Sequence, residues 1–174
     1  MQPSVSTPPA GEHVNPVQRV ISELRALSTV QDRLDQYAAA RFGVNRTDLR
    51  ALDLIGQAGA TSPTALAAAL GMSTGATSTV LDRLEAAGYV RREPDPHHRR
   101  RTVVRMTPAA EALSAGIFDP VIGATAERAG ALPAHLLADV AAFLAAHRQA
   151  LADYLDGQAA TTTAEGDADP GAGR

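Results

Sequence analysis

The 174-residue sequence contains no cysteine, no lysine and no tryptophan, and only 3% of its residues are aromatic. The absence of cysteine excludes disulfides, cysteine-ligated zinc and thiol redox sensing, and it agrees with a reducing compartment. No apolar run approaches the roughly 20 residues that a membrane-spanning helix needs. The first fifteen residues also lack the basic and then apolar pattern of a signal peptide. We therefore expect a soluble, cytoplasmic protein without membrane contact.

Hydrophobic residues nevertheless make up 45% of the chain, and alanine is abundant among them. This composition favours close-packed helices over a β-sandwich or barrel. The length allows one ordinary domain with an added oligomerisation element. We expect a mainly α fold.

Charge is distributed unevenly along the chain. The formal net charge is −3, which by itself argues against a nucleic-acid partner. Residues 83–105, however, hold seven arginines against three acidic residues, a local net charge of +4. A basic segment in an acidic chain is typical of a local DNA-binding surface, although a solvated charged hairpin would have the same composition.

Residues 62–107 read as a short helix, a turn, a second helix and a β-hairpin. Ser62 and Pro63 can open the first helix and Gly71 can end it. Ser73 or Thr74 can cap the second helix, which Gly88 ends. Strands are expected at residues 89–90 and 103–106, joined by an arginine-rich loop. This order is typical of a winged helix-turn-helix, a DNA-binding fold.

The second of these helices is the candidate recognition helix. Its predicted packing stripe is Ala76, Val80, Leu84 and Ala87. Short polar side chains on the remaining surface can approach phosphates and base edges in a major groove, or can simply be solvated. The candidate DNA-binding residues are Ser73, Thr74, Thr77, Ser78, Thr79 and Arg83. For Arg83 we weigh a phosphate contact against pairing with an acid on its own helix.

The hairpin supplies the second set of candidates. Arginines at its tip can enter a narrow minor groove, where the phosphate potential is most negative. Because neighbouring strand residues point to opposite faces, not all of them can reach the groove. The candidate wing residues are Asp95, His98, Arg99, Arg100 and Arg101.

Long helices flank this segment. Asn15 can cap a helix to residue 42 with an apolar seam from Val17 to Ala38, and a second seam runs from Leu136 to Leu155. Such seams suit either a partner helix or packing within the chain. Pro120 should kink or break the helix that Pro108 opens. We expect disordered segments at residues 1–14 and 157–174, helical dimerisation regions at 15–42 and 108–156, and the winged helix at 43–107.

The sequence offers little for catalysis or metal binding. His97 and His98 could titrate near the arginines, but no histidine and acid cluster has the spacing of a metal site. No serine lies in a glycine-flanked elbow, and there is no phosphate-binding glycine loop. We expect no enzyme activity, no metal and no cofactor.

The segments ALAAALGMSTGA, VLDRLEAAGYVRR and DPHHRRRTVVRMTPA, within residues 44–109, resemble the MarR (multiple antibiotic resistance regulator) family. The resemblance covers about a third of the chain. It implies a homodimer in which the first helix and the last two interlock while two winged helices bind a palindromic operator. It places Arg100 in the minor groove, near Asp95. Many relatives carry an arginine where this chain has Thr79 and an aspartate where it has His98.

We expect a dimeric repressor that a small ligand, such as an anionic aromatic molecule, releases from double-stranded DNA. Pockets favour junctions between lobes, and the candidate pocket residues there are Tyr37, Arg41, Phe42 and Phe118. The alternative function is an effector-free winged-helix module that serves DNA architecture or protein interaction.

Overall fold

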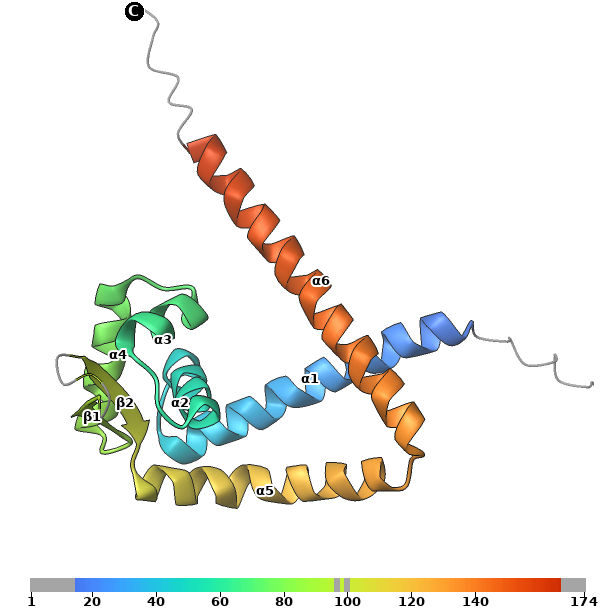
Figure 1. The fold of residues 1–174 in the computed structure, drawn as a ribbon, viewed down its shortest axis with the longest axis horizontal. Helices are drawn as coiled ribbons and strands as arrows, with labels where there is room; N and C mark the ends of the chain where they lie inside the picture. The colour runs from blue at the N-terminus through green and yellow to red at the C-terminus, as the bar shows by residue number, and fades with distance from the viewer. Residues whose placement is uncertain (1–14, 96–97, 99–100, 167–174) are drawn as a thin grey trace, which may run out of the picture. The chain divides into compact units, whose positions relative to one another are not determined.

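The structure, a computed structural model, describes residues 15–95, 98 and 101–166, the last eight as backbone only. The predictions for residues 1–14 and 167–174 lie outside these ranges. The chain forms six helices and one β-hairpin within the described residues (Figure 1). In chain order they are α1 (Pro16–Phe42), α2 (Arg46–Ala58), α3 (Pro63–Leu70), α4 (Thr74–Ala86), β1 (Val90–Pro94), β2 (Thr102–Met106), α5 (Pro108–Gly130) and α6 (Ala134–Gly166).

The helix ends form where short polar residues and glycines punctuate the sequence. The side chains of Asn15, Asn45, Ser62 and Ser73 each accept a hydrogen bond from a backbone N–H of the first turn that follows. These bonds satisfy donors that have no partner inside the helix. Gly43 ends α1 at φ 65°, a left-handed conformation that glycine adopts without steric cost. The predicted starts of α1, α3 and α4 are therefore confirmed.

The hairpin pairs β1 with β2 in antiparallel register, from Val90 opposite Met106 to Pro94 opposite Thr102. A third segment joins this sheet through one bridge, in which Thr61 exchanges both backbone hydrogen bonds with Val104, at 3.1 and 2.7 Å. The sheet is thus tied to the chain just before α3. This tie fixes the root of the hairpin against the helices.

The hydrophobic core lies where α2, α3 and α4 meet the hairpin, the end of α1 and the start of α5. Its fully buried side chains include Leu52, Ile55, Leu66, Leu81 and Leu84. Phe42 packs edge-on against Tyr89, with ring centroids 5.2 Å apart, and the Tyr89 hydroxyl donates to the Phe42 carbonyl. The core therefore holds the end of α1 against the first residue of the hairpin.

The chain divides into two compact units, Met1–Asp119 and Pro120–Arg174, with the boundary inside α5. Two predictions in this part of the chain are contradicted. Pro120 does not break α5, because the loss of one intrahelical donor is local and the helix continues on both sides. The alternative prediction, a kink at Pro120, stays a prediction. The last helix does not end before Gly157, since α6 extends to Gly166. Extending an existing helix needs no new nucleus, so the low helix propensities of one glycine and three threonines do not prevent it.

Candidate nucleic-acid interface

The recognition helix presents a short-chained polar surface. Ser73 caps α4 by accepting from the Ala76 N–H at 3.2 Å, and Ser73, Thr74, Ser78 and Thr79 are exposed. The exposed face carries no large side chain in its first two turns, so a DNA groove could approach its backbone closely. Four of the six predicted recognition residues thus lie together on one surface.

Thr77 is wrongly placed by the sequence prediction, because its side chain is completely buried. The buried stripe of α4 consists of Thr77, Val80, Leu81 and Leu84, whereas Ala76 and Ala87 are exposed. Both stripes have helical spacing, and burying Leu81 instead of alanine removes more apolar surface from water. The Thr77 hydroxyl donates to the Ser73 carbonyl at 3.0 Å, so its burial leaves no polar atom unsatisfied.

Arg83 pairs with an acid, but on another helix rather than its own. Its Nε and Nη2 donate to the two carboxylate oxygens of Asp48, at 3.0 and 2.5 Å. The Asp48 side chain is 5% exposed and also accepts a hydrogen bond from Asn45, its partner in the capping box of α2. The hydrogen bond to Asp48 raises the pKa of Arg83 above its ordinary value. Arg83 therefore joins α4 to the start of α2, and a phosphate contact would compete with this pair.

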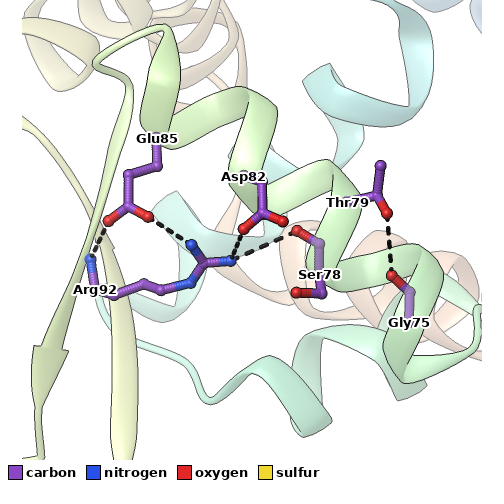
Figure 2. A network of polar contacts seen from close by, with 6 residues as sticks. All are labelled: Gly75, Ser78, Thr79, Asp82, Glu85 and Arg92. Carbon is purple, nitrogen blue, oxygen red and sulfur yellow. Dashed lines mark hydrogen bonds and ion pairs between the residues drawn. The ribbon is translucent and has the colours of Figure 1, made fainter.

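Arg92 was not predicted as a site residue; in the sequence it was only one of the seven arginines of the basic segment. Figure 2 shows its guanidinium between two acids of α4, with Nη1 donating to Glu85 at 2.5 Å and Nη2 to Asp82 at 2.7 Å. A further bond of 3.5 Å reaches the Ser78 carbonyl, and the Arg92 N–H donates to Glu85 at 3.2 Å. Burial opposes the charged form, but these hydrogen bonds outweigh it and raise the pKa of Arg92.

The ion pairs of Arg92 connect two elements of the lobe. Arg92 lies on β1, and both acids lie on α4, so the ion pairs join the first strand of the wing to the recognition helix. A signal was present in the sequence, since Asp82 and Glu85 are three residues apart and share a helical face. Their arginine partner could not be identified, because it comes from a different element.

Other wing arginines also have partners. Arg91 and Arg105 both pair with Glu93, and Arg105 donates to the Gly59 carbonyl at 3.1 Å. The arginines of the two strands are therefore not uncommitted cations. They stabilise the pairing of β1 with β2 and fix the hairpin to α4 and to the loop after α2.

The end of the hairpin is closed by backbone hydrogen bonds among described residues. The Asp95 N–H donates to the Arg101 carbonyl at 2.8 Å, and the Arg101 N–H donates to the His98 carbonyl at 2.7 Å. His98 and Arg101 are exposed, and Asp95 is partly exposed. Arg99 and Arg100, the other predicted wing residues, lie outside the described residues.

The four predicted pocket residues do not form one site. Phe42 belongs to the core, whereas Tyr37 and Arg41 are exposed. Phe118 lines a pocket of about 350 Å³ without the other three. Its remaining lining residues are Asp35, Arg46, Leu49, Arg50 and Asp53. Phe42 is absent from the pocket because it lies at the end of α1, where its ring packs against Tyr89.

Along the described part of the chain, no three histidine or acidic side chains are grouped so that they could hold a metal ion. None of the helices in residues 15–166 is both long and apolar enough to cross a bilayer.

Comparison with known proteins agrees with this geometry. A family model described as the MarR family matches residues 42–101. The HTH-type transcriptional regulator YcgE of Bacillus subtilis is 38% identical over 101 residues, which are 58% of this chain and 66% of that protein. The multiple antibiotic resistance protein MarR of Salmonella typhimurium is 31% identical over 83 residues, or 48% of this chain and 58% of that protein. The matches thus span two thirds or less of these relatives.

A solved structure extends the likeness to the flanking helices. RV1404 from Mycobacterium tuberculosis superposes with a TM-score of 0.57 at 20% identity, over 82% of this chain and 98% of that one. At this identity the likeness concerns the fold alone. The matching family model and the two relatives identify the winged helix of residues 42–101 as one of the MarR family.

Proposed function

We propose that this protein is a homodimeric transcriptional repressor that binds a palindromic operator in double-stranded DNA and is released by a small ligand. In this proposal α4 enters the major groove and the hairpin lies over the adjacent minor groove. The observation that carries it is the exposed polar face of α4 together with the Arg92 network that joins α4 to the wing. An operator-binding protein must share a compartment with the chromosome, so the proposal includes a cytoplasmic location, as in its bacterial relatives.

Exposed apolar side chains support a dimer. In the first unit the apolar seam of α1 divides: Ala38 is buried in the core, whereas Val17 is 62% exposed and Leu27 52% exposed. In the second unit α6 exposes Leu136, Val140, Phe143, Leu144, Leu151, Tyr154 and Leu155. Monomeric proteins rarely leave apolar surface this extended, so a second copy is the natural partner. Twofold symmetry in the dimer would explain a palindromic site.

The pocket beside Phe118 supports ligand control. Its lining combines the Phe118 ring and the guanidinium groups of Arg46 and Arg50 with the carboxylates of Asp35 and Asp53. The ring and the two arginines offer contacts to a small aromatic anion, and the two acids require that the ligand also carry a hydrogen-bond donor. Arg46 pairs with Asp32 of α1, with Nη2 and Oδ1 2.5 Å apart. The two side chains are 68% and 50% exposed, so the pair is weak and an anion could compete for Arg46. Arg46 also lines a groove with Thr79 and Arg83 of α4. Arg46 therefore lines both the pocket and a groove beside the recognition helix, so a ligand that moves its side chain would change the surface next to α4.

Selection of bound sequences from a random DNA pool tests the DNA-binding part of the proposal. We expect enrichment of a palindrome whose half-sites lie about one helical turn apart, with an affinity that falls as salt rises. Enrichment of no sequence would contradict it. Salt-dependent binding without sequence preference would favour the effector-free architectural module.

Ligand control is tested separately, by screening aromatic acids for thermal stabilisation and then for release of bound operator. Compounds that bind should weaken operator affinity, and operator should weaken their binding by the same factor. An Arg50→Gln variant should lose the stabilisation, while Arg128→Gln, which lies outside the pocket, should keep it. If compounds bind through Arg50 and never change operator affinity, the pocket is not regulatory.

A further inference from the structure

We propose that Thr79 recognises the methyl group of a thymine in the operator, through its own methyl group. This inference rests on the proposed DNA-binding function and names the base that the centre of the recognition helix reads. The position of Thr79 is the first reason. An α-helix turns by about 100° per residue, so Thr79 lies about 200° around the axis of α4 from Thr77, which is completely buried. Thr79 and Gly75 thus form the centre of the exposed face.

The second reason is the orientation of the Thr79 side chain. Its hydroxyl donates to the Gly75 carbonyl at 3.2 Å. A threonine hydroxyl has one hydrogen, so this bond occupies its only donor. In Figure 2 the hydroxyl is turned toward Gly75 and the methyl group away from it. The side chain therefore offers an approaching base a methyl group rather than a hydrogen-bond donor.

The bond itself is ordinary, because threonines inside helices often donate to the carbonyl four residues earlier. Thr29 makes the same bond to Arg25 on α1, at 3.1 Å. What distinguishes Thr79 is the surface around its methyl group. A Cβ built on Gly75 would meet no atom within 4 Å, and Ala76 is exposed and short. Larger side chains, those of Arg46, Met72 and Arg83, line a groove that Thr79 shares. On the Gly75 side of Thr79 no large side chain lies in the way, so a base can come close to the Thr79 methyl from there.

Nearby charges argue against the usual recognition of guanine, in which an arginine binds the base through two hydrogen bonds. The single arginine of α4 is Arg83, which is held by Asp48 to one side of the helix. On the other side, Arg92 is held by Asp82 and Glu85. The centre of the face is thus left to Thr79. The thymine methyl is the apolar feature of the major groove, and apolar contact is how side chains recognise it.

The test uses the full-length protein and a duplex selected from a random pool. Each thymine of the duplex is replaced in turn by deoxyuridine, which removes the methyl group and leaves base pairing unchanged. We expect one replacement in each half-site to weaken binding about three- to tenfold, the effect of losing one buried methyl contact. Replacements elsewhere in that half-site should have smaller effects.

Two substitutions assign the effect to Thr79. Thr79→Val keeps the methyl group and removes the hydroxyl, so the deoxyuridine penalty at that position should persist. Thr79→Ser keeps the hydroxyl and removes the methyl group, so the penalty should disappear. Thr29 makes the matching hydrogen bond on α1, so Thr29→Ser is the control: it removes a methyl group outside the recognition helix and should leave the penalty unchanged. Thermal melting of each variant, expected to match the wild type, shows that folding does not differ.

Two outcomes overturn the inference while leaving the DNA-binding function intact. One is a selected site in which no deoxyuridine replacement weakens wild-type binding. The other is a penalty of equal size in wild type and Thr79→Ser. Failure of the pool to yield any preferred sequence would overturn the proposed function, and the inference would fall with it.

Discussion

The winged-helix lobe (residues 43–107) and the long helices α1 and α6 bury their apolar residues to very different degrees. In the lobe, Leu52, Leu66, Leu81 and Leu84 are at most 2% exposed. Along α6, Leu151 and Leu155 are 53% and 64% exposed. The lobe satisfies its own hydrophobic residues within one chain, whereas α6 leaves a continuous apolar surface. Under the proposed function, the exposed apolar surface of α6 is where a second copy would pack, whereas the core of the lobe, completed by the end of α1 and the start of α5, is buried within one chain.

The polar residues repeat this contrast. Four arginines of the lobe, Arg83, Arg91, Arg92 and Arg105, each pair with an acid, and for three of them the pair joins different elements. In the second unit, the polar bonds of Arg128 and Gln149 stay within one helix, reaching four residues along it. Bonds between elements fix a tertiary geometry, whereas bonds within a helix only support that helix. The lobe is therefore built to hold a defined shape for binding.

Truncating a core residue of the lobe should have the largest effect. Leu84→Ala should lower the free energy of unfolding by about 2–5 kcal/mol, because it removes a fully buried side chain and leaves a cavity. Urea denaturation measures it. Leu27→Ala provides the matched truncation on the exposed part of α1 and should affect self-association rather than the lobe. An equal loss of lobe stability in both variants would show that the α1 seam is ordinary core.

Placing a charge on the α6 surface should disrupt the proposed dimer. Leu151→Asp would bury one carboxylate from each copy in an apolar interface, and we expect the dimer dissociation constant to rise at least about a hundredfold, or about 2.7 kcal/mol. Light scattering across protein concentration measures the change. The same substitution at Gln149, which bonds to Asp153, is the control on this helix. A dimer unaffected by Leu151→Asp would assign the interface to another surface.

The predicted wing arginine should matter next. From the sequence we expect Arg100→Ala to weaken operator binding by about 1–3 kcal/mol and to make its salt dependence shallower, since one counterion-releasing contact is lost. Fluorescence anisotropy at several salt concentrations measures both quantities. Arg128→Ala, outside the lobe, should change neither. Unchanged affinity and slope for Arg100→Ala would mean that this arginine is solvated in the complex.

The smallest effect on stability should come from Arg92→Gln. Its ion pairs are partly exposed, so we expect a loss of about 1 kcal/mol or less in thermal or urea unfolding. Operator affinity should fall by more than stability alone would explain, because the wing loses its link to α4. Arg91→Gln removes a pair that stays on one strand, with Glu93, and should affect binding less. Equal effects of the two variants on binding would contradict the proposed role of Arg92.

The starts of α1, α3 and α4 were predictable because their causes are local. Asn15, Ser62 and Ser73 cap helices whatever they pack against, and Gly43 allows the left-handed turn that ends α1. The buried face of α4 was not predictable, because two stripes with helical spacing compete and only contacts with α2 and the hairpin decide between them. The sequence therefore misplaced Thr77 and Leu81.

The polar partners show the same limit. Arg83 and Asp48 are 35 residues apart in the chain, and Arg92 lies ten residues after Asp82. Local spacing reveals that acids share a helical face, but it does not reveal which arginine reaches them. The pocket prediction failed for a related reason: Phe118 lines a cavity, whereas Phe42 is held in the core by Tyr89.

The central claim is that the winged-helix lobe binds DNA and that the long helices bring two lobes together. The mass of the protein–DNA complex tests this claim most directly. Sedimentation equilibrium on a selected duplex, with the protein in excess, measures that mass. The account predicts two chains on a duplex with both half-sites, and much weaker binding to a duplex in which one half-site is scrambled. One chain on each duplex at saturation, with the same affinity for the scrambled site, would contradict it.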